Sequence, residues 1–225
     1  MNTSFWQAAL SITRKDLRAE LRSRELVNTM GLFALLSVLV FSFALELDRV
    51  ARQEAVSGVL WVTVVFASIL GLNRSMAMER EQGSLDALLM APISRTAIFA
   101  GKLIGNFLFT LIVGLVLLPL MAMLYNMPLV QPWIVVVLLL GIIGFATVGT
   151  LLATMTVQTR ARESLLPIVM LPLALPVLLA AVNASTAILN NAPQDDWIAW
   201  PQILVVADVV YLTLCFLLFE YVIES

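Results

Sequence analysis

The chain has 225 residues, of which 61% are hydrophobic and 12% are charged, and its mean hydropathy is +0.98. Ordinary soluble domains carry roughly 25% charged residues, so this composition indicates an integral membrane protein. The single cysteine, Cys215, excludes a disulfide framework and a cysteine-based zinc site, and no histidine is present to serve as a general base, metal ligand or haem ligand. A sequence pI of about 5.1 argues against a surface that binds nucleic acid.

An amphipathic helix is predicted over residues 4–24. One face repeats apolar residues at helical spacing, namely Trp6, Leu10, Thr13, Leu17 and Leu21. The other faces are basic and carry Arg14, Lys15, Arg18 and Arg22. We expect this helix to lie along the inner leaflet, where anionic lipid headgroups attract lysine and arginine. The alternative is a solvated helix that acts only as a topology signal.

Six stretches of about 20 apolar residues follow, which is the length needed to cross the hydrocarbon layer. We place the spans at residues 27–45, 57–72, 98–125, 133–155, 165–182 and 203–222. The second is short and is expected to continue as a helix into the polar region 74–82. The predicted fold class is therefore an all-α polytopic membrane protein, organised as one transmembrane domain over residues 1–225.

Lysine and arginine residues orient these spans. They gather before the first span, between the second and third, and after the fourth, whereas the opposite loops hold only Arg49 and Arg52. Because basic loops stay in the cytoplasm, both termini are expected there. Arg95 and Lys102 are expected to anchor the start of span three at the headgroups, and residues 183–202 are expected to form a loop on the opposite side.

A second short helix is predicted over residues 84–91, between spans two and three. Gly83 favours the end of the preceding helix, Ser84 is a suitable N-cap, and Pro92 favours the end of the new one. Three leucines at positions i, i+3 and i+4 share one face of this helix: Leu85, Leu88 and Leu89. An apolar face outside the hydrocarbon must pack against the bundle, the lipid surface or another protein, and the residues alone leave these three open.

The region around this helix resembles the coupling region of ABC-2 type permeases. The matching residues are Arg80, Glu81, Gly83, Ser84, Leu85, Leu88, Leu89, Pro92, Ile93, Ser94, Gly101 and Lys102. Within that superfamily, the length, the six spans and the proline-rich fifth span "LPIVMLPLALPVLLAA" are similar to the haem exporter B (CcmB-like) family of bacterial cytochrome c maturation. The similarity extends over nearly the whole chain.

This resemblance implies a bacterial inner-membrane subunit, not itself an enzyme, that receives work from a separate cytoplasmic ATPase docked on the predicted coupling helix. It also implies a second membrane subunit that handles haem, and a periplasmic haem chaperone that accepts it. ATP would act through the ATPase subunit, and this chain would bind no cofactor directly. The sequence agrees, because Gly101 and Lys102 are not part of a G-x-x-x-x-G-K-[ST] phosphate loop.

Several features inside the spans allow both a structural and a functional interpretation. Gly101 and Gly105 form a small-x-x-x-small face, which usually packs within the bundle. Three prolines interrupt span five and could form a hinge or a static kink: Pro167, Pro172 and Pro176. Three threonines share one face of span four and could serve either helix packing or a transport pathway: Thr147, Thr150 and Thr154.

Two further features lie in or before span six. Asp208 is an intramembrane carboxylate if it lies inside the bundle, and a headgroup-level residue if the span begins close to Ile203. Trp197 and Trp200 either anchor the outer interface or contact a periplasmic partner or a porphyrin.

Two other functions remain open. An ABC-2 type exporter could carry a drug, a lipid or a glycan by the same mechanism. A stand-alone secondary transporter would need paired intramembrane charges and a repeated broken-helix pattern, and no such repeat is visible in the sequence.

Overall fold

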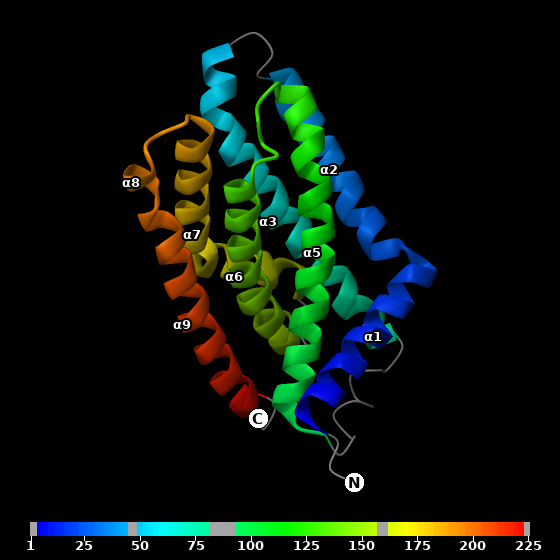
Figure 1. Cartoon of the computed structure of the whole chain (residues 1–225). Helices are drawn as coiled ribbons and strands as arrows, with labels where there is room; N and C mark the ends of the chain where they lie inside the picture. Colours follow the sequence, from blue (N-terminus) through cyan, green and yellow to red (C-terminus); the bar gives the residue numbers. More distant parts are fainter. Residues whose placement is uncertain (1–3, 45–48, 82–92, 157–161, 223–225) are drawn as a thin grey trace.

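A computed structural model describes residues 4–44, 49–81, 93–156 and 162–222, and within these ranges the protein is helical with no strand (Figure 1). The helices are α1 (Phe5–Ser23), α2 (Glu25–Ala44), α3 (Arg49–Glu81), α5 (Arg95–Tyr125), α6 (Pro132–Thr156), α7 (Arg162–Leu189), α8 (Gln194–Trp197) and α9 (Ala199–Val222). Six helical segments are long and apolar enough to cross a membrane, which confirms the all-α, six-span prediction. The predicted coupling helix at 84–91 lies outside the described residues.

The spans divide into a centre and a periphery. In α3 and α6, 72% of the most apolar 18-residue window is buried inside the protein, against 22% in α2 and in the last span. Figure 1 shows the same arrangement, with α2 and α9 on opposite sides of the bundle. The start of α1 and the end of α9 lie at the same end of the molecule, as an even number of crossings requires. The peripheral helices therefore present their apolar side chains to lipid.

The N-terminal helix α1 ends in a tight elbow. Arg24 adopts a left-handed conformation (φ 55°), and its backbone N–H donates to the carbonyl of Glu20 over 2.7 Å. The Glu20 carboxylate then accepts hydrogen bonds from the backbone N–H groups of Leu26 and Val27, at 3.3 and 2.8 Å. Because the first N–H groups of a helix have no partner within it, this carboxylate caps α2. The elbow thus fixes the angle between α1 and α2.

The amphipathic helix expected at residues 4–24 is confirmed, and its apolar face is divided between two environments. Thr13 is buried against α5 and Leu17 is partly buried. Trp6, Leu10 and Leu21 point away from the bundle and are exposed. This is the arrangement that a helix needs if it packs sideways on a bundle and contacts lipid along its length.

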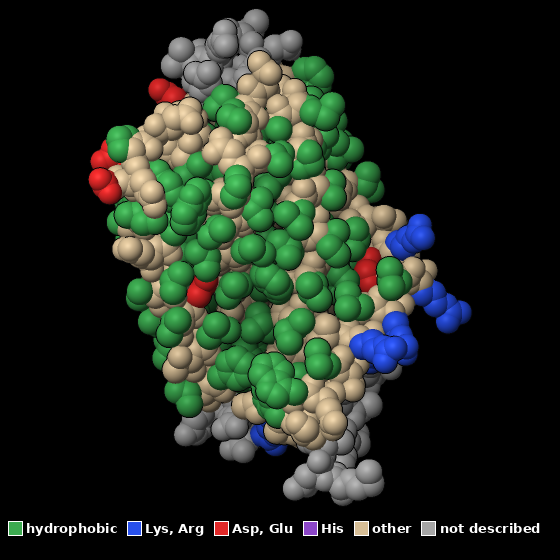
Figure 2. All heavy atoms as spheres, viewed as in Figure 1, with side chains coloured by type: hydrophobic (Ala, Val, Ile, Leu, Met, Phe, Trp, Pro, Cys, Tyr) green, Lys and Arg blue, Asp and Glu red, His purple; other side chains and the backbone are tan. Residues whose placement is uncertain are grey.

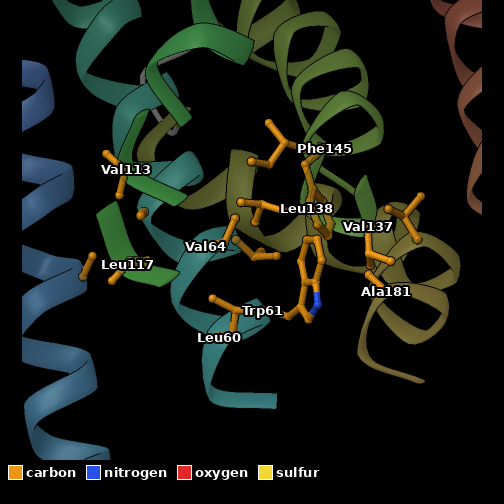
Figure 3. Close-up of a cluster of buried hydrophobic side chains, with 14 of the residues drawn as sticks. Leu60, Trp61, Val64, Val113, Leu117, Val137, Leu138, Phe145 and Ala181 are labelled. Atoms are coloured by element: carbon orange, nitrogen blue, oxygen red, sulfur yellow. The ribbon is translucent and has the colours of Figure 1, made fainter. Parts of the chain in front are cut away.

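Trp61 of α3 fills the middle of the bundle. Its side chain is fully buried, and Figure 3 shows its ring among Leu138, Phe145 and Ala181. The indole Nε1–H donates to the Ser185 hydroxyl of α7 over 2.9 Å, so the polar atom of this large side chain is satisfied. The ring fits because the facing α6 position is Gly141, where a Cβ atom would lie 2.2 Å from it.

Two expected loop regions differ from the structure. α3 continues to Glu81, as expected, but it begins at Arg49 and not at residue 57; its 33 residues extend about 50 Å, which exceeds the roughly 30 Å hydrocarbon layer. The predicted loop over 183–202 is mostly wrong, because α7 continues to Leu189 and α9 begins at Ala199. Asn183 is accommodated in α7, where its side-chain amide donates to the Leu179 carbonyl at 2.8 Å within the same helix.

We predict that Gly141→Ala destabilises the bundle by about 1–3 kcal/mol, because the added methyl forces Trp61 out of its position. The measurement is the thermal unfolding midpoint of the purified chain in a mild detergent. Gly58→Ala in α3 is the matched control, since nothing lies within 4 Å of its added Cβ. Equal midpoints for both variants would contradict the packing described here.

Candidate functional site

Polar side chains occur at every fourth position in the first half of α5. Lys102, Asn106 and Thr110 lie on one helix face, and all three are buried. Such residues are costly inside a membrane bundle unless each finds a partner. Each of the three bonds to a side chain of a neighbouring helix, and together they define a polar stripe within α5.

Lys102 forms the centre of a charged cluster. Its side chain is 1% exposed, and its ammonium group lies 2.8 Å from Oδ2 of Asp16 in α1 and also pairs with the Glu79 carboxylate of α3. Lys15 completes the group, with its Nζ 3.3 Å from Oδ1 of Asp16 and 3.8 Å from Oε1 of Glu79. Two cations therefore balance two carboxylates. The expectation that Lys102 anchors span three at the headgroups is wrong, because the side chain turns inward to these acids.

The cluster requires a close approach of α1 to α5, which Gly101 allows, while Gly105 lies at ordinary contact distance from α1. At Gly101 an added Cβ would lie 2.8 Å from both the Ala9 carbonyl oxygen and the Ile12 Cβ, while at Gly105 it would lie 3.8 Å from the Asp16 carboxylate. The Thr13 hydroxyl also donates to the Gly101 carbonyl over 2.9 Å. The predicted packing role of this glycine pair is confirmed, and the partner helix is α1.

The rest of the stripe joins α5 to the two central helices. The Asn106 amide donates to the Thr150 hydroxyl of α6 over 2.9 Å, and the Thr110 hydroxyl lies 3.4 Å from that of Ser68 in α3. The other two threonines of span four, Thr147 and Thr154, donate to carbonyls of their own helix. The predicted threonine stripe therefore serves helix packing in this structure.

The cluster joins the two helices that precede and follow the predicted coupling segment in the sequence. Glu79 is in the last turn of the described part of α3, where Arg80 and Glu81 also lie, and Lys102 is in the second turn of α5. The other predicted coupling residues lie outside the described part of the chain: Gly83, Ser84, Leu85, Leu88, Leu89 and Pro92. Their proposed role remains a prediction, but the helices before and after them are tied together by the same lysine.

A pocket of about 80 Å³ lies next to this cluster. Its lining includes Lys15, Asp16, Glu20 and Glu79. A space of this size has room for water, and its polar lining could hold it. The charged side chains therefore border a small cavity with polar lining, and they are not enclosed by apolar atoms alone.

α7 remains helical through Pro167, Pro172 and Pro176. A proline removes one backbone N–H donor and displaces the carbonyls one turn earlier. The Tyr211 hydroxyl of α9 donates to the Leu173 carbonyl, three residues before Pro176, over 2.6 Å. A side chain from the neighbouring helix thus stabilises α7 at this proline, and a hinge or kink at the three prolines stays a prediction.

Asp208 lies inside the bundle. α9 begins at Ala199, so Asp208 is about 14 Å along the helix, and its side chain is buried with no hydrogen-bond partner among the described residues. It rests against Gly144 of α6, where an added Cβ would be 2.8 Å from its Oδ1. The alternative of a headgroup-level residue is therefore wrong.

The aromatic residues before the last span pack within the protein. The Trp197 ring is buried and contacts Trp133 edge to face, with 5.1 Å between the ring centroids. Trp200 is partly buried against the main core. Trp197 is thus a structural contact between the start of α6 and the start of the last span.

Comparison with known proteins identifies the family. The family model described as "CcmB protein" matches residues 7–223, nearly the entire chain. The chain belongs to the CcmB family. Among its relatives is "Heme exporter protein B" of Escherichia coli K12, which is 31% identical over 205 residues that cover 87% of each chain. "Heme exporter protein B" of Rhodobacter capsulatus is 31% identical over 170 residues, covering 75% of this chain and 78% of the relative.

For this CcmB family member, the charged cluster is the part of the site that sequence reasoning missed. The signal was present as a polar residue at every fourth position of an otherwise apolar span, Lys102, Asn106 and Thr110. Helical spacing places them on one face. It does not show which face is buried, nor that Asp16, 86 positions earlier in the chain, supplies the counter-charge.

We predict that Lys102→Met destabilises the protein by about 3–5 kcal/mol, because it leaves the Asp16 and Glu79 carboxylates buried without their cation. The midpoint of unfolding by sodium dodecyl sulfate would measure this. Adding Glu79→Gln to Lys102→Met should restore part of the loss, since one unpaired charge is removed. Lys15→Met, whose side chain is 43% exposed, should cost less than about 1 kcal/mol. A Lys102→Met protein as stable as the parent would contradict a buried ion-paired cluster.

Proposed function

We propose that this chain is the membrane subunit of an ABC complex that handles haem in cytochrome c biogenesis. It would lie in the bacterial inner membrane with both termini in the cytoplasm. The observation that carries the proposal is the CcmB family match over residues 7–223, together with relatives named "Heme exporter protein B". The six helices able to cross a membrane support the same assignment.

Energy would enter through a separate ATPase subunit, because the chain contains no phosphate-binding loop motif. In the proposal, the apolar face of the helix at 84–91 docks in a groove of that ATPase. Nucleotide-driven closure of the ATPase then displaces this helix and the two helices next to it, α3 and α5.

The charged cluster would make α1, α3 and α5 move as one unit. Lys102 links the end of α3 to the start of α5 and to α1, so a displacement of the coupling segment cannot separate these helices without exposing unpaired charges. α3 is one of the two central helices, and it packs against α2, α5, α6 and α7. A push at its cytoplasmic end would therefore reach most of the bundle.

Haem itself would be handled by other subunits. The chain has no histidine with which to hold haem iron, and its one cysteine, Cys215, is buried between helices. A second membrane subunit would present the haem, and a periplasmic chaperone would accept it. In this proposal the present chain supplies mechanical work for that release.

A stand-alone secondary transporter fits less well. Such a protein needs intramembrane charges that pair or bind a coupling ion. In the described residues Asp208 has no hydrogen-bond partner, and Lys102 is used to join helices. Export of another cargo would use the same coupling, and identification of the subunits that co-purify with the chain distinguishes it.

We predict that the double variant Leu85→Asp with Leu88→Asp loses the ATPase subunit. Two carboxylates in the middle of the docking face would be buried without partners, at a cost of several kcal/mol. The measurements are co-purification of the ATPase with the tagged chain and assembly of cytochrome c in cells. The variant should still accumulate in the membrane, because the changed residues lie between the spans.

The matched control is Asp86→Asn with Ala87→Ser, which alters the other side of the same short helix and creates no buried charge. It should retain the ATPase. If the double aspartate variant captured the ATPase as well as the parent does, the helix at 84–91 would not be the docking site. Capture of the ATPase without any haem-handling subunit would instead indicate a different cargo.

The proposed orientation gives a separate prediction. A cysteine placed at exposed Asn190, between α7 and α8, should react with a membrane-impermeant maleimide in cells with an opened outer membrane. A cysteine at Ser84 should react only after the inner membrane is opened. The native Cys215 is buried and should contribute little labelling. Labelling of Ser84→Cys from outside would overturn the orientation and with it the docking of a cytoplasmic ATPase.

A further inference from the structure

A groove of about 340 Å³ lies in the angle between α1 and α2, with α5 as its floor. Its apolar lining comes from all three helices and consists of Leu17, Leu21, Val27, Phe109 and Ile112. Its polar lining is Glu20, Arg24 and Asn28. The volume falls in the roughly 300–1,000 Å³ range of ligand sites. The groove is distinct from the 80 Å³ pocket next to the charged cluster, although Glu20 and Phe109 line both.

The groove opens toward lipid and not toward the core. Two of its lining side chains are largely exposed, Leu21 at 75% and Ile112 at 45%. They belong to the apolar sides of α1 and of the membrane-spanning α5. The apolar part of such a hollow must be filled by something equally apolar, because water finds no hydrogen-bond partner among those side chains.

The polar side of the groove carries one carboxylate, Glu20, and one exposed cation, Arg24. The Glu20 carboxylate is already used, since it accepts the backbone N–H groups of Leu26 and Val27. Arg24, at the elbow, is exposed and forms no ion pair with any described residue. Arg18 and Arg22 are also exposed, on the basic side of α1. Figure 2 shows lysine and arginine side chains gathered on this edge of the molecule. The ligand is therefore expected to combine an apolar chain with a negative head.

We propose that this groove binds one anionic phospholipid, with an acyl chain between α1, α2 and α5 and its phosphate on Arg24. An arginine matches a phosphate through two parallel hydrogen bonds, whereas the carboxylate beside it is already satisfied. The lipid fills the angle behind the elbow, so it holds α1 in place against α5. Through α1 it supports the position of Asp16, and therefore the charged cluster around Lys102.

The test is native mass spectrometry of the full chain, released from detergent with added phosphatidylglycerol or phosphatidylcholine of identical acyl chains. The parent should bind its first phosphatidylglycerol on the order of fivefold more tightly than phosphatidylcholine, the factor expected for one basic residue near an anionic lipid. Arg24→Gln should reduce this ratio to about one. Arg24→Lys should retain most of it, because the positive charge is kept.

Two controls separate a defined site from general attraction to a basic helix. Arg14→Gln removes a charge from the exposed side of the same helix, away from the groove, and should leave the ratio unchanged. Leu17→Trp fills the groove and should weaken the first binding event for both lipids.

The proposal is overturned if Arg24→Gln binds the first phosphatidylglycerol as tightly as the parent, or if Arg14→Gln lowers the ratio equally. It is also overturned if the chain is released as a dimer that takes up no lipid and that Leu17→Trp dissociates, since the groove would then be a contact between copies.

Discussion

The ion pairs of Lys102 determine how α1, α3 and α5 are assembled. A lysine that is 1% exposed is stable only if its charge is matched, and both carboxylates that match it come from other helices. α1 is consequently part of the bundle, although its exposed apolar side chains resemble those of a helix lying on a membrane surface. Asn106 and Thr110, the other polar residues of the stripe, lie one and two turns further along α5, and each also bonds to a side chain of a neighbouring helix.

Close packing of backbones makes these contacts possible. Within a lipid bilayer apolar burial gives little preference for helix contact over lipid contact, so packing and interhelical hydrogen bonds supply the association energy. Glycines are found where the approach is closest: Gly101 faces α1, Gly141 faces Trp61, and Gly144 faces Asp208. Each of these positions is small because the facing group is large or polar. The glycines therefore have a steric role and not a conformational one.

The structure also distinguishes polar groups that hold the bundle from one that does not. Thr150, Asn106 and Tyr211 each complete a hydrogen bond between helices. Asp208 is buried like Thr150 and Asn106, and it completes none among the described residues. A group that is kept in the interior without a packing role is the natural candidate for a part in the working cycle. The proposed mechanical function does not yet assign it one, whereas it does use the stripe of α5.

The sequence determined the features that depend on local physics. Apolar length fixed the number of spans, because about 20 residues are needed to cross the hydrocarbon, and helical spacing fixed the amphipathic helix at residues 4–24. The resemblance also led to the family, which the match over residues 7–223 confirms. The helix at 84–91 stays a prediction, since it lies outside the described residues.

Only the tertiary structure decided which side chains meet. Lys102 was expected at the headgroups, which is a reasonable place for a lysine near the start of a span, yet it turns inward to Asp16 and Glu79. Asn183 was expected to begin a loop, yet α7 continues past it. In both cases the outcome depends on partners that are supplied by folding: two carboxylates from other helices for Lys102, and for α7 the packing of Ser185 against Trp61. A polar residue in an apolar sequence signals that a partner exists, but its identity depends on which helices the bundle brings together.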